Sequence, residues 1–282
     1  MQIETPYLMF LGDVPDRLAA KTAYGIKDWR PEWCVGQLRL PGCAADLGIP
    51  DLTLAEAAAR HGRQLHDVRH SEERFDTGKG TRRPGRRLLT VGTDCSVGKK
   101  YTVLALEKGM RERGLDADFR ATGQTGVFIS GRGVAIDAVV ADFISGAVEW
   151  IAPAADPTHW DLIEGQGSLF HPSFAGVSLG LLHGAQADAF VVCHEPTRTT
   201  MRGVKHPLPS IKEVIDLTVQ LGRLTNPDIR PTGIAVNTQA LEEGEARALL
   251  KKLAAEHGLP ATDPVRFGVE ALVDRLVEEF PA

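Results

Sequence analysis

The residues with the clearest chemical pattern lie at positions 91–102, where the sequence is VGTDCSVGKKYT. The run RLLTV (87–91) precedes this segment and a helical pattern follows it. A strand, a glycine-bounded loop and a helix start form the layout of a phosphate-binding P-loop, whose N–H groups point inward at an anion. The positive end of the helix adds to such a site. We therefore predict that phosphate is bound by Thr93, Asp94, Cys95, Ser96, Val97, Gly98, Lys99, Lys100 and Tyr101.

The loop departs from the common nucleotide-binding pattern at the position that serves the metal. The residue after the loop lysine is usually Ser or Thr, whose hydroxyl holds Mg²⁺. Here that residue is Lys100, and the nearby hydroxyls of Ser96 and Thr102 stand at other spacings. A second ammonium group suits an anionic ligand without a metal better than a magnesium–nucleotide complex. We therefore predict a phosphate cradle without a metal and do not favour ATP hydrolysis.

The composition is that of an ordinary globular protein of 282 residues, with 43% hydrophobic and 24% charged residues. A net charge of −5 gives no general attraction to nucleic acid. No apolar run approaches the roughly 18 residues of a membrane span, and the first residues, MQIETP, lack a signal architecture. The four cysteines match no zinc or disulfide pattern, so we expect a cytoplasmic protein.

The elements that must position the loop alternate along residues 86–282. Apolar runs predict strands at 88–92, 117–121, 160–164, 189–194 and 233–237, and helical patterns cover 99–113, 134–150, 210–224 and 241–257. This alternation predicts an α/β fold of the P-loop NTPase kind, with a parallel sheet covered by helices on both faces. The stretch 134–150 is apolar nearly all round, which fits either the core or a subunit interface. We therefore expect a homo-oligomer.

Residues 1–85 differ from the rest and predict a smaller N-terminal α/β domain followed by a linker. Apolar patterns indicate strands near 8–12 and 33–40 and helices over 16–28 and 52–62. The polar stretch 69–85 holds three glycines, so we place the domain boundary at 85/86. Its basic run is either a solvated linker or a contact to an outer phosphate: Lys79, Arg82, Arg83, Arg86 and Arg87.

A carboxylate, Glu164, ends the third predicted strand, where P-loop enzymes carry an acid. Ligands of such sheets bind at the carboxyl ends of the strands. Without a metal, burial can raise the pKa of this Glu towards neutrality and make it a general base. The alternative is a structural Glu that fixes the next loop. His171, in the segment FHPSF (170–174), is a second candidate base, although a lone His is more often structural.

The other strand ends supply polar groups for a small-molecule substrate. Arg198 and Arg202 follow the fourth strand, and Arg binds carboxylates with two parallel hydrogen bonds; a solvated loop is the alternative. Asn237 follows the fifth strand, where an amide often binds a purine edge. The turn 123–126 is either an ordinary turn or a set of donors. The candidate substrate residues are Arg120, Thr122, Gln124, Thr125, Gln166, Ser168, Arg198 and Arg202.

Several longer motifs resemble those of known proteins. GTDCSVGK (92–99), EGQG (164–167) and Asn237 resemble the dethiobiotin synthetase type of P-loop fold. With ATGQTG (121–126), GQGSLFHP (165–172) and CHEPTR (193–198) added, the chain is similar to the DgcN-type D-glutamate N-acetyltransferase family. The similarity runs from Leu8 to Phe267.

This resemblance implies an enzyme that acetylates the amine of an acidic amino acid, D-glutamate, from acetyl-CoA without Mg²⁺. For this chemistry Glu164 or His171 is the candidate base, and Lys99 of the P-loop is the third catalytic candidate. The alternatives are a ligase or kinase that uses Mg·ATP, and a non-catalytic module that binds CoA or a nucleotide. The family's N-terminal domain has a further strand and helix between segments like 52–59 and 61–70, which are joined directly here.

Overall fold

The computed structural model describes residues 8–9, 34–35, 68–69, 71 and 73–281. The chain divides into two units, Met1–Glu73 and Arg74–Ala282, so the division comes before the boundary expected at 85/86. In the first unit, β1 (Leu8–Met9) pairs in parallel with β2 (Cys34–Val35), within the two predicted strands. The helices predicted at 16–28 and 52–62 lie outside the described residues.

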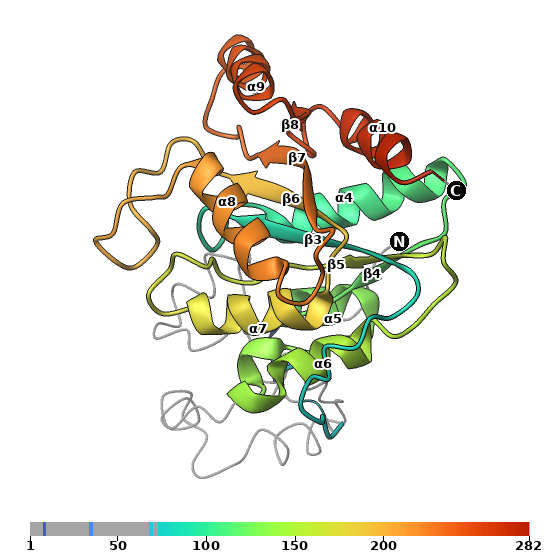
Figure 1. Cartoon of the computed structure of the whole chain (residues 1–282). Helices are drawn as coiled ribbons and strands as arrows, with labels where there is room; N and C mark the ends of the chain where they lie inside the picture. Colours follow the sequence, from blue (N-terminus) through green and yellow to red (C-terminus); the bar gives the residue numbers. More distant parts are fainter. Residues whose placement is uncertain (1–7, 10–33, 36–67, 70, 72, 282) are drawn as a thin grey trace. The chain divides into compact units, whose positions relative to one another are not determined.

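The second unit is built on a parallel sheet of six strands, in the order β4-β5-β3-β6-β7-β8 (Figure 1). The strands are β3 (Arg86–Gly92), β4 (Ala117–Arg120), β5 (Trp160–Ile163), β6 (Ala189–His194), β7 (Arg230–Val236) and β8 (Ala261–Thr262). The first five coincide with predicted runs. β8 has only two residues and was not predicted. Because all the pairings are parallel, the carboxyl ends of the central strands meet at one edge.

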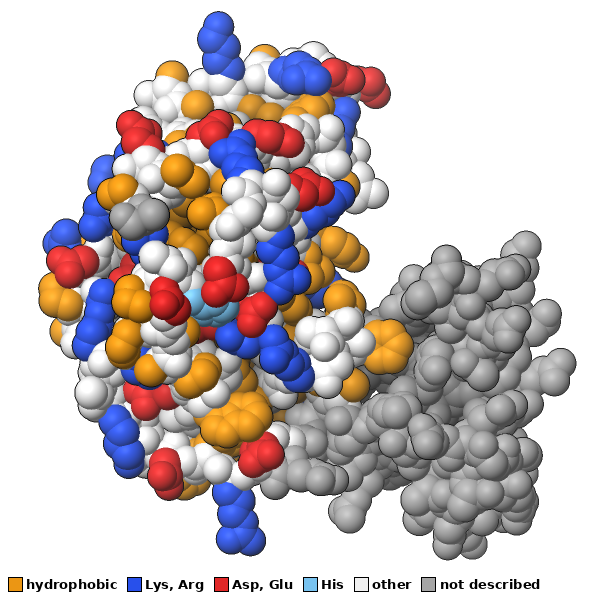
Figure 2. Space-filling view, turned by 90° about the vertical axis from the view of Figure 1, so that its right-hand side faces the viewer, with side chains coloured by type: hydrophobic (Ala, Val, Ile, Leu, Met, Phe, Trp, Pro, Cys, Tyr) orange, Lys and Arg blue, Asp and Glu red, His pale blue; other side chains and the backbone are white. Residues whose placement is uncertain are grey.

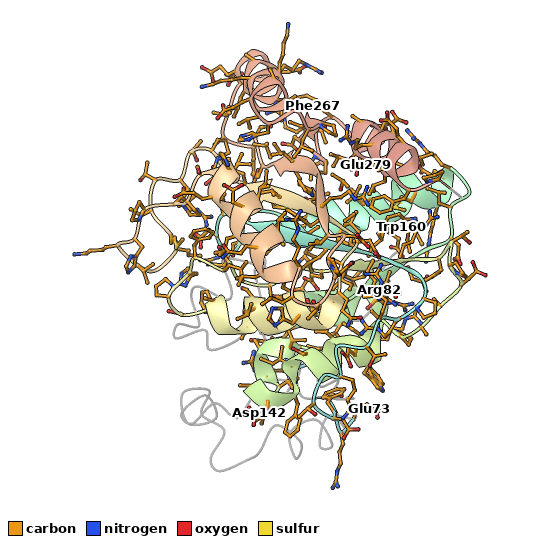
Figure 3. All side chains as sticks on the ribbon, in the orientation of Figure 1. Glu73, Arg82, Asp142, Trp160, Phe267 and Glu279 are labelled. Atoms are coloured by element: carbon orange, nitrogen blue, oxygen red, sulfur yellow. The ribbon has the colours of Figure 1, made fainter. Side chains whose placement is uncertain are left out.

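Two residues of the predicted basic run, Arg82 and Arg83, are bound to the protein itself and contact no outer phosphate site, whereas Lys79 is exposed, as in a solvated linker. Arg82 lies 2.6 Å from the carboxylate of Asp188, and Arg83 donates to the carbonyls of Ala152 and Gly184. Figure 3 labels Arg82 and Trp160 at the amino ends of the strands. On this side of the molecule, Lys and Arg side chains are interspersed with Asp and Glu (Figure 2).

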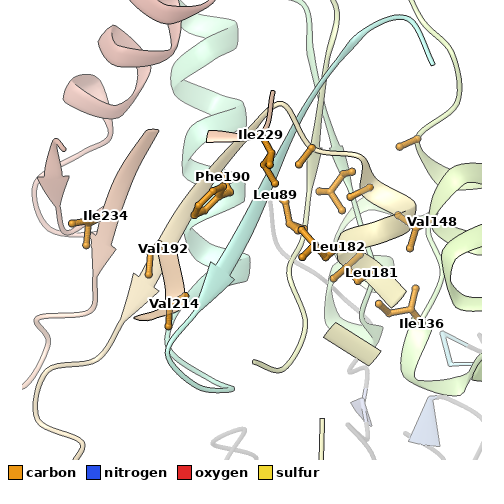
Figure 4. Packing of buried hydrophobic residues seen from close by; sticks show 14 of the residues in the cluster. Leu89, Ile136, Val148, Leu181, Leu182, Phe190, Val192, Val214, Ile229 and Ile234 are labelled. Carbon is orange, nitrogen blue, oxygen red and sulfur yellow. The ribbon is translucent and has the colours of Figure 1, made fainter. Parts of the chain in front are cut away.

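Helices cover both faces of the sheet, as predicted. One face carries α4 (Lys99–Glu112) and α10 (Glu270–Glu279), and the other α6 (Ile144–Ile151), α7 (Ala175–Ala185), α8 (Ile211–Gly222) and α9 (Glu243–His257). The second face packs around Leu181, Phe190 and Val192 (Figure 4). β6 is buried on both sides, as a central parallel strand must be. None of the helices in the described residues is long and apolar enough to cross a bilayer.

The stretch 134–150 is not a single helix. It forms two 3-10 turns, η2 (Ile136–Ala138) and η3 (Ala141–Phe143), before α6 begins. Between them Val139 and Val140 have extended ψ angles of 139 and 136, which β-branched residues favour. Val140 is 67% exposed, so the stretch has a surface side as well as a core side.

Candidate active site

The turn between β3 and α4 has the layout of the predicted P-loop. Gly98 has a φ of 107, in the left-handed region that favours glycine, and α4 begins at the next residue. The Lys99 side chain is buried, and its Nζ donates to the carbonyl oxygens of Asp94 at 2.7 Å and Gly167 at 2.8 Å. Burial lowers the pKa of Lys99. Both of these partners are neutral, so they do not cancel the charge of the ammonium.

The Asp94 carboxylate joins the P-loop to the loop after β6. Its Oδ2 accepts from the Arg198 guanidinium at 2.6 Å and from the Arg202 backbone N–H at 2.7 Å, and its Oδ1 accepts from the Cys95 N–H at 2.7 Å. Burial raises the pKa of Asp94, but these hydrogen bonds outweigh it and lower that pKa below its ordinary value. Asp94 is therefore ionised and fully engaged within the protein.

The two arginines predicted to clamp a substrate both reach the P-loop. Arg198 also donates to the carbonyl of Cys95 at 2.8 Å, and Arg202 Nη1 donates to Ser96 Oγ at 2.6 Å. Arg198 thus links the loop after β6 to the P-loop. Arg202 is exposed, and its role as a clamp stays a prediction.

Glu164 follows β5 and lies beside the P-loop lysines. It is 5% exposed, and its Oε2 accepts from the backbone N–H groups of Thr122 at 3.1 Å and Gly123 at 3.2 Å. Burial raises the pKa of Glu164 to about 7, even though those N–H groups and the charges of Lys100 and Lys99 lower it. A carboxylate with this pKa exchanges a proton readily near neutral pH.

Two glycines leave room for this carboxylate and for the loop that follows it. A Cβ on Gly126 would lie 2.2 Å from Glu164 Oε2, and a Cβ on Gly165 would lie 1.6 Å from the carbonyl oxygen of Thr90. Gly126 belongs to α5 (Gln124–Ser130), a helix in a segment that the sequence pattern had left as a turn. No side chain other than glycine fits at either position without moving the site.

The predicted substrate residues separate into three groups. Thr122 and Gln166 come together, since Gln166 Nε2 donates to Thr122 Oγ1 at 3.1 Å. Gln124 and Thr125 lie in the first turn of α5, next to the residues that hold Glu164. Ser168 is buried, and its hydroxyl accepts from the Phe170 N–H at 3.3 Å, so it shapes a turn.

His171 is held as a structural residue, which argues against the prediction that it is a base. Its Nδ1 accepts from the Ser173 N–H at 3.2 Å, so the proton resides on Nε2, which lies 2.9 Å from the carbonyl oxygen of Arg202. The ring is 1% exposed and stacks on Phe174 at 4.3 Å. Neither ring nitrogen is left to take a substrate proton.

Asp94, Cys95 and His171 place one possible metal-ligating atom each within 4.8 Å of one another. Both oxygens of Asp94 and both ring nitrogens of His171 already have the protein partners described above. This group is therefore a hydrogen-bonded cluster and does not fit a metal ion.

Arg120 points away from the site, which corrects the prediction that it contacts a substrate. Its Nε lies 2.5 Å from Asp161 Oδ1 and its Nη2 lies 3.4 Å from Asp118 Oδ2. Asp161 is also aligned with Arg87 of β3 and is 1% exposed. The guanidinium of Arg120 thus completes a buried charge network towards the amino ends of the strands.

A pocket of about 540 Å³ opens beside the P-loop. It is bounded by Gly98 and Tyr101 at the start of α4, by Asn237 and Gln239 after β7, and by the segment 263–266. Tyr101 is 60% exposed and presents a ring at this pocket. Its size suits a small-molecule or cofactor site, and its position places the predicted residue Asn237 next to the P-loop.

The model of a P-loop domain of unknown function, DUF1611, matches residues 74–273. The chain belongs to the DUF1611 family. Two curated relatives are named D-glutamate N-acetyltransferase, which confirms the expected resemblance. The one from Tritonibacter scottomollicae is 46% identical, over 97% of this chain and 99% of the relative, and the one from a Pseudoalteromonas species is 45% identical, over 98% and 100%.

A crystal structure of a DUF1611 family protein from Anabaena variabilis is 36% identical, with a TM-score of 0.77 over 87% of this chain and 71% of that one. The alignment with the first relative covers 329 positions, more than the 282 residues of this chain. That relative therefore has residues that this DUF1611 protein lacks.

Sequence reasoning missed several residues of the DUF1611 site. His194 is the last residue of β6, and its Nδ1 lies 3.1 Å from Thr93 Oγ1 of the P-loop. Burial lowers the pKa of His194. Its place at the end of a central strand was a usable signal. Gln239 and Arg266 of the pocket carried none, because they come from loops without a motif.

Proposed function

We propose that the protein is an N-acetyltransferase that moves an acetyl group from acetyl-CoA to the amine of D-glutamate. The names of the two curated relatives support the reaction and the acceptor. The single observation that carries the proposal is Glu164, a buried carboxylate with a pKa of about 7 beside the P-loop. Such a group suits the removal of a proton from an amine near neutral pH.

The donor binds across the P-loop and the adjoining pocket. Its diphosphate accepts hydrogen bonds from the N–H groups of the loop and pairs with Lys99, whose present partners are neutral carbonyls. Its adenine enters the pocket beside Tyr101 and Asn237. The volume of this pocket, and the fact that Gly98 of the P-loop lines it, support this orientation of the donor.

In the reaction, Glu164 takes a proton from the substrate ammonium, and the free amine attacks the carbonyl carbon of the thioester. The new C–N bond forms, the C–S bond breaks, and CoA leaves as a thiolate that takes up a proton. The N–H groups of Gly123 and Gly165 already bind Glu164 and Thr90. We therefore assign stabilisation of the oxyanion to the N–H groups of Gly167 and Ser168.

The substrate carboxylates are assigned to the loop after β6. Arg198 is bound to Asp94, so it holds this loop against the P-loop. Arg202 is exposed and is the guanidinium that we assign to a carboxylate. Thr122 and Gln166, hydrogen-bonded to each other beside Glu164, are assigned to polar groups of the same substrate.

Self-association and a cytoplasmic location also belong to the proposal. Val140, Phe143 and Trp150 are 67%, 36% and 50% exposed, which supports a subunit contact along 140–150. Cys95 and Cys193 are free thiols, as expected in a reducing compartment. Sedimentation of the purified protein tests the first point, and a monomer at all concentrations contradicts it.

The proposal is tested by incubating the protein with acetyl-CoA and a panel of D- and L-amino acids while the free thiol and the product mass are followed. We expect thiol release that depends on D-glutamate and a matching N-acetyl product. Thiol release with no amino-acid dependence, or turnover only with Mg·ATP, would overturn it.

The P-loop assignment has its own control. Lys99→Ala should weaken CoA binding measured by calorimetry, whereas Lys108→Ala, on an exposed face of the same helix, should not. Equal CoA affinity in both variants would remove the P-loop from the mechanism.

A further inference from the structure

We propose that Lys100 takes the place that a magnesium ion has in other P-loop proteins and thereby selects phosphate ligands that bind without a divalent cation. The inference rests on the proposed use of the P-loop for the donor's diphosphate. Lys100 lies in the first turn of α4, and we assign to its side chain the selection of the donor, which the proposed reaction leaves open.

The fold itself implies a magnesium ion, since P-loop proteins hold one with a Ser or Thr hydroxyl after the loop lysine and an acid on a nearby strand. The residue after Lys99 in this chain is Lys100, whose side chain has no oxygen to offer. The donor set at this position is therefore wrong for a hard cation, which requires oxygen ligands.

The neighbouring hydroxyls do not replace the missing ligand. Thr102 is 3% exposed, and its Oγ1 accepts from the thiol of Cys193 at 3.5 Å on the core side of α4. Ser96 Oγ lies 2.6 Å from Arg202 Nη1, which is a positive group. Thr102 lines the pocket, but its hydroxyl is bound to the thiol of Cys193, and the hydroxyl of Ser96 is bound to a cation, so both hydroxyls already have partners in the protein.

The acid at the strand end is equally unsuited to a metal. Glu164 Oε2 already accepts hydrogen bonds from the backbone N–H groups of Thr122 and Gly123. A magnesium ion at this oxygen would have to displace both of these donors. The residues present thus do not fit the ion that the fold implies.

Lys100 supplies a positive charge in place of the magnesium ion. The side chain is partly buried, and its Nζ lies 5.0 Å from the ring centroid of Tyr101, which borders the pocket. Its charge acts on Glu164, and lowers the pKa of that carboxyl. A divalent ion beside Lys99 and Lys100 would meet two like charges, whereas the phosphates of a metal-free ligand would be attracted by both.

The test is the binding of CoA and of ATP, each with excess Mg²⁺ or with EDTA, to the wild type, Lys100→Thr and Lys100→Met. For the wild type we expect dissociation constants that differ less than about twofold between the two conditions, equivalent to less than about 0.4 kcal/mol. Lys100→Thr restores the hydroxyl, and should bind ATP at least about tenfold more tightly with Mg²⁺ than with EDTA.

Lys100→Met removes the charge without adding an oxygen, and should bind both ligands more weakly with no response to Mg²⁺. Thermal unfolding of each variant confirms that it is folded, and Lys108→Thr controls for a threonine in α4. Wild-type binding that requires Mg²⁺, or a Lys100→Thr variant that responds to Mg²⁺ no more than Lys100→Met, overturns the inference.

Failure of this inference and failure of the proposed function give different results. Acetyl transfer that needs Mg²⁺ refutes the role of Lys100 and leaves the acetyltransferase standing. CoA binding that is independent of Mg²⁺, combined with no acetyl transfer to any amino acid, supports the role of Lys100 and refutes the proposed acetyltransferase.

Discussion

The two edges of the sheet carry similar sets of charged residues and use them in opposite ways. At the amino edge, Asp161 lies between Arg120 and Arg87, and Asp188 is paired with Arg82. At the carboxyl edge, the ammonium of Lys99 and the carboxylate of Glu164 are held by neutral backbone groups. The charges of Asp161 and Asp188 are thus balanced by opposite charges, whereas those of Lys99 and Glu164 are met by peptide dipoles, although Asp94 at the carboxyl edge is also paired with Arg198.

This difference separates a structural network from a reactive site. The carboxylate of Asp161 lies between two guanidinium groups, and these contacts fix the packing around it. For Glu164, burial raises the pKa to about 7, because it outweighs the N–H groups and the lysine charges that lower this pKa. Residue type alone did not distinguish the edges, but the partners of each charge do.

The largest expected effect is that of Glu164→Gln on turnover. Loss of a general base lowers rates by about 10²–10⁴-fold, while the amide keeps the shape and can still accept from the N–H groups of Thr122 and Gly123. Steady-state kinetics and CoA calorimetry check this, with CoA affinity expected to stay close to that of the wild type. Unchanged turnover would move the base to another group.

At the amino edge, Asp161→Asn should act on stability and leave chemistry alone. Removing the charge leaves Arg120 and Arg87 without their buried partner, at a cost of about 3–5 kcal/mol of unfolding free energy. Urea unfolding measures the loss, and CoA binding to the folded protein should be unchanged. A variant of full stability that no longer binds CoA would show that the edges are not independent.

The pH dependence should separate the edges further. Because Glu164 must be ionised to act and has a pKa of about 7, kcat/KM should fall about tenfold per pH unit below 7, and this dependence should be absent in Glu164→Gln.

The same shift has a consequence for stability, with a definite sign. The folded pKa of Glu164 lies above its ordinary value of 4.5, so the folded protein binds this proton more tightly and loses stability as the pH rises from 4.5 to about 7. Glu164→Gln should therefore gain thermal stability relative to the wild type between pH 5 and pH 8. A constant difference in Tm over that range would contradict the assignment.

The smallest expected effect comes from one methyl group. Gly126→Ala places a Cβ against Glu164 Oε2 and should lower kcat by roughly tenfold, equivalent to about 1.4 kcal/mol. Gly176→Ala, also in a helix but with no atom near its new Cβ, should raise stability by up to about 1 kcal/mol with no effect on kcat. Equal kinetics in the two variants would mean that Glu164 can shift without loss.

The fold could be predicted where local pattern determines it. The apolar runs that became β3 and β6 and the glycine before α4 are local, and the sequence identified them. The stretch 134–150 failed because its periodicity did not reveal the extended Val139 and Val140. α7 was not predicted, since its all-round apolar composition gives little helical periodicity.

The location of the site could be predicted from the sequence, because the carboxyl ends of parallel strands meet at one edge of the sheet. The contacts of the individual side chains could not. Glu164 was predicted because it ends a strand, and it lies beside the P-loop lysines, but Arg120 ends a strand as well and turns back to Asp161. The direction of a long side chain depends on partners far away in sequence, here across β5. The partner of His171, the carbonyl of Arg202, is likewise far away in sequence, and its contact favours the structural alternative that the sequence left open.

Asp94 ties the turn that would grip the donor to the backbone of the loop that would meet the acceptor, through the N–H groups of Cys95 and Arg202. A ligand that changes the conformation of the P-loop must therefore also change the hydrogen bond that Asp94 accepts from the loop after β6. The two substrates should then affect one another's affinity by equal factors, since linkage is reciprocal. Through such coupling, the carboxylate of Asp94 would influence how strongly each substrate binds before and after the other.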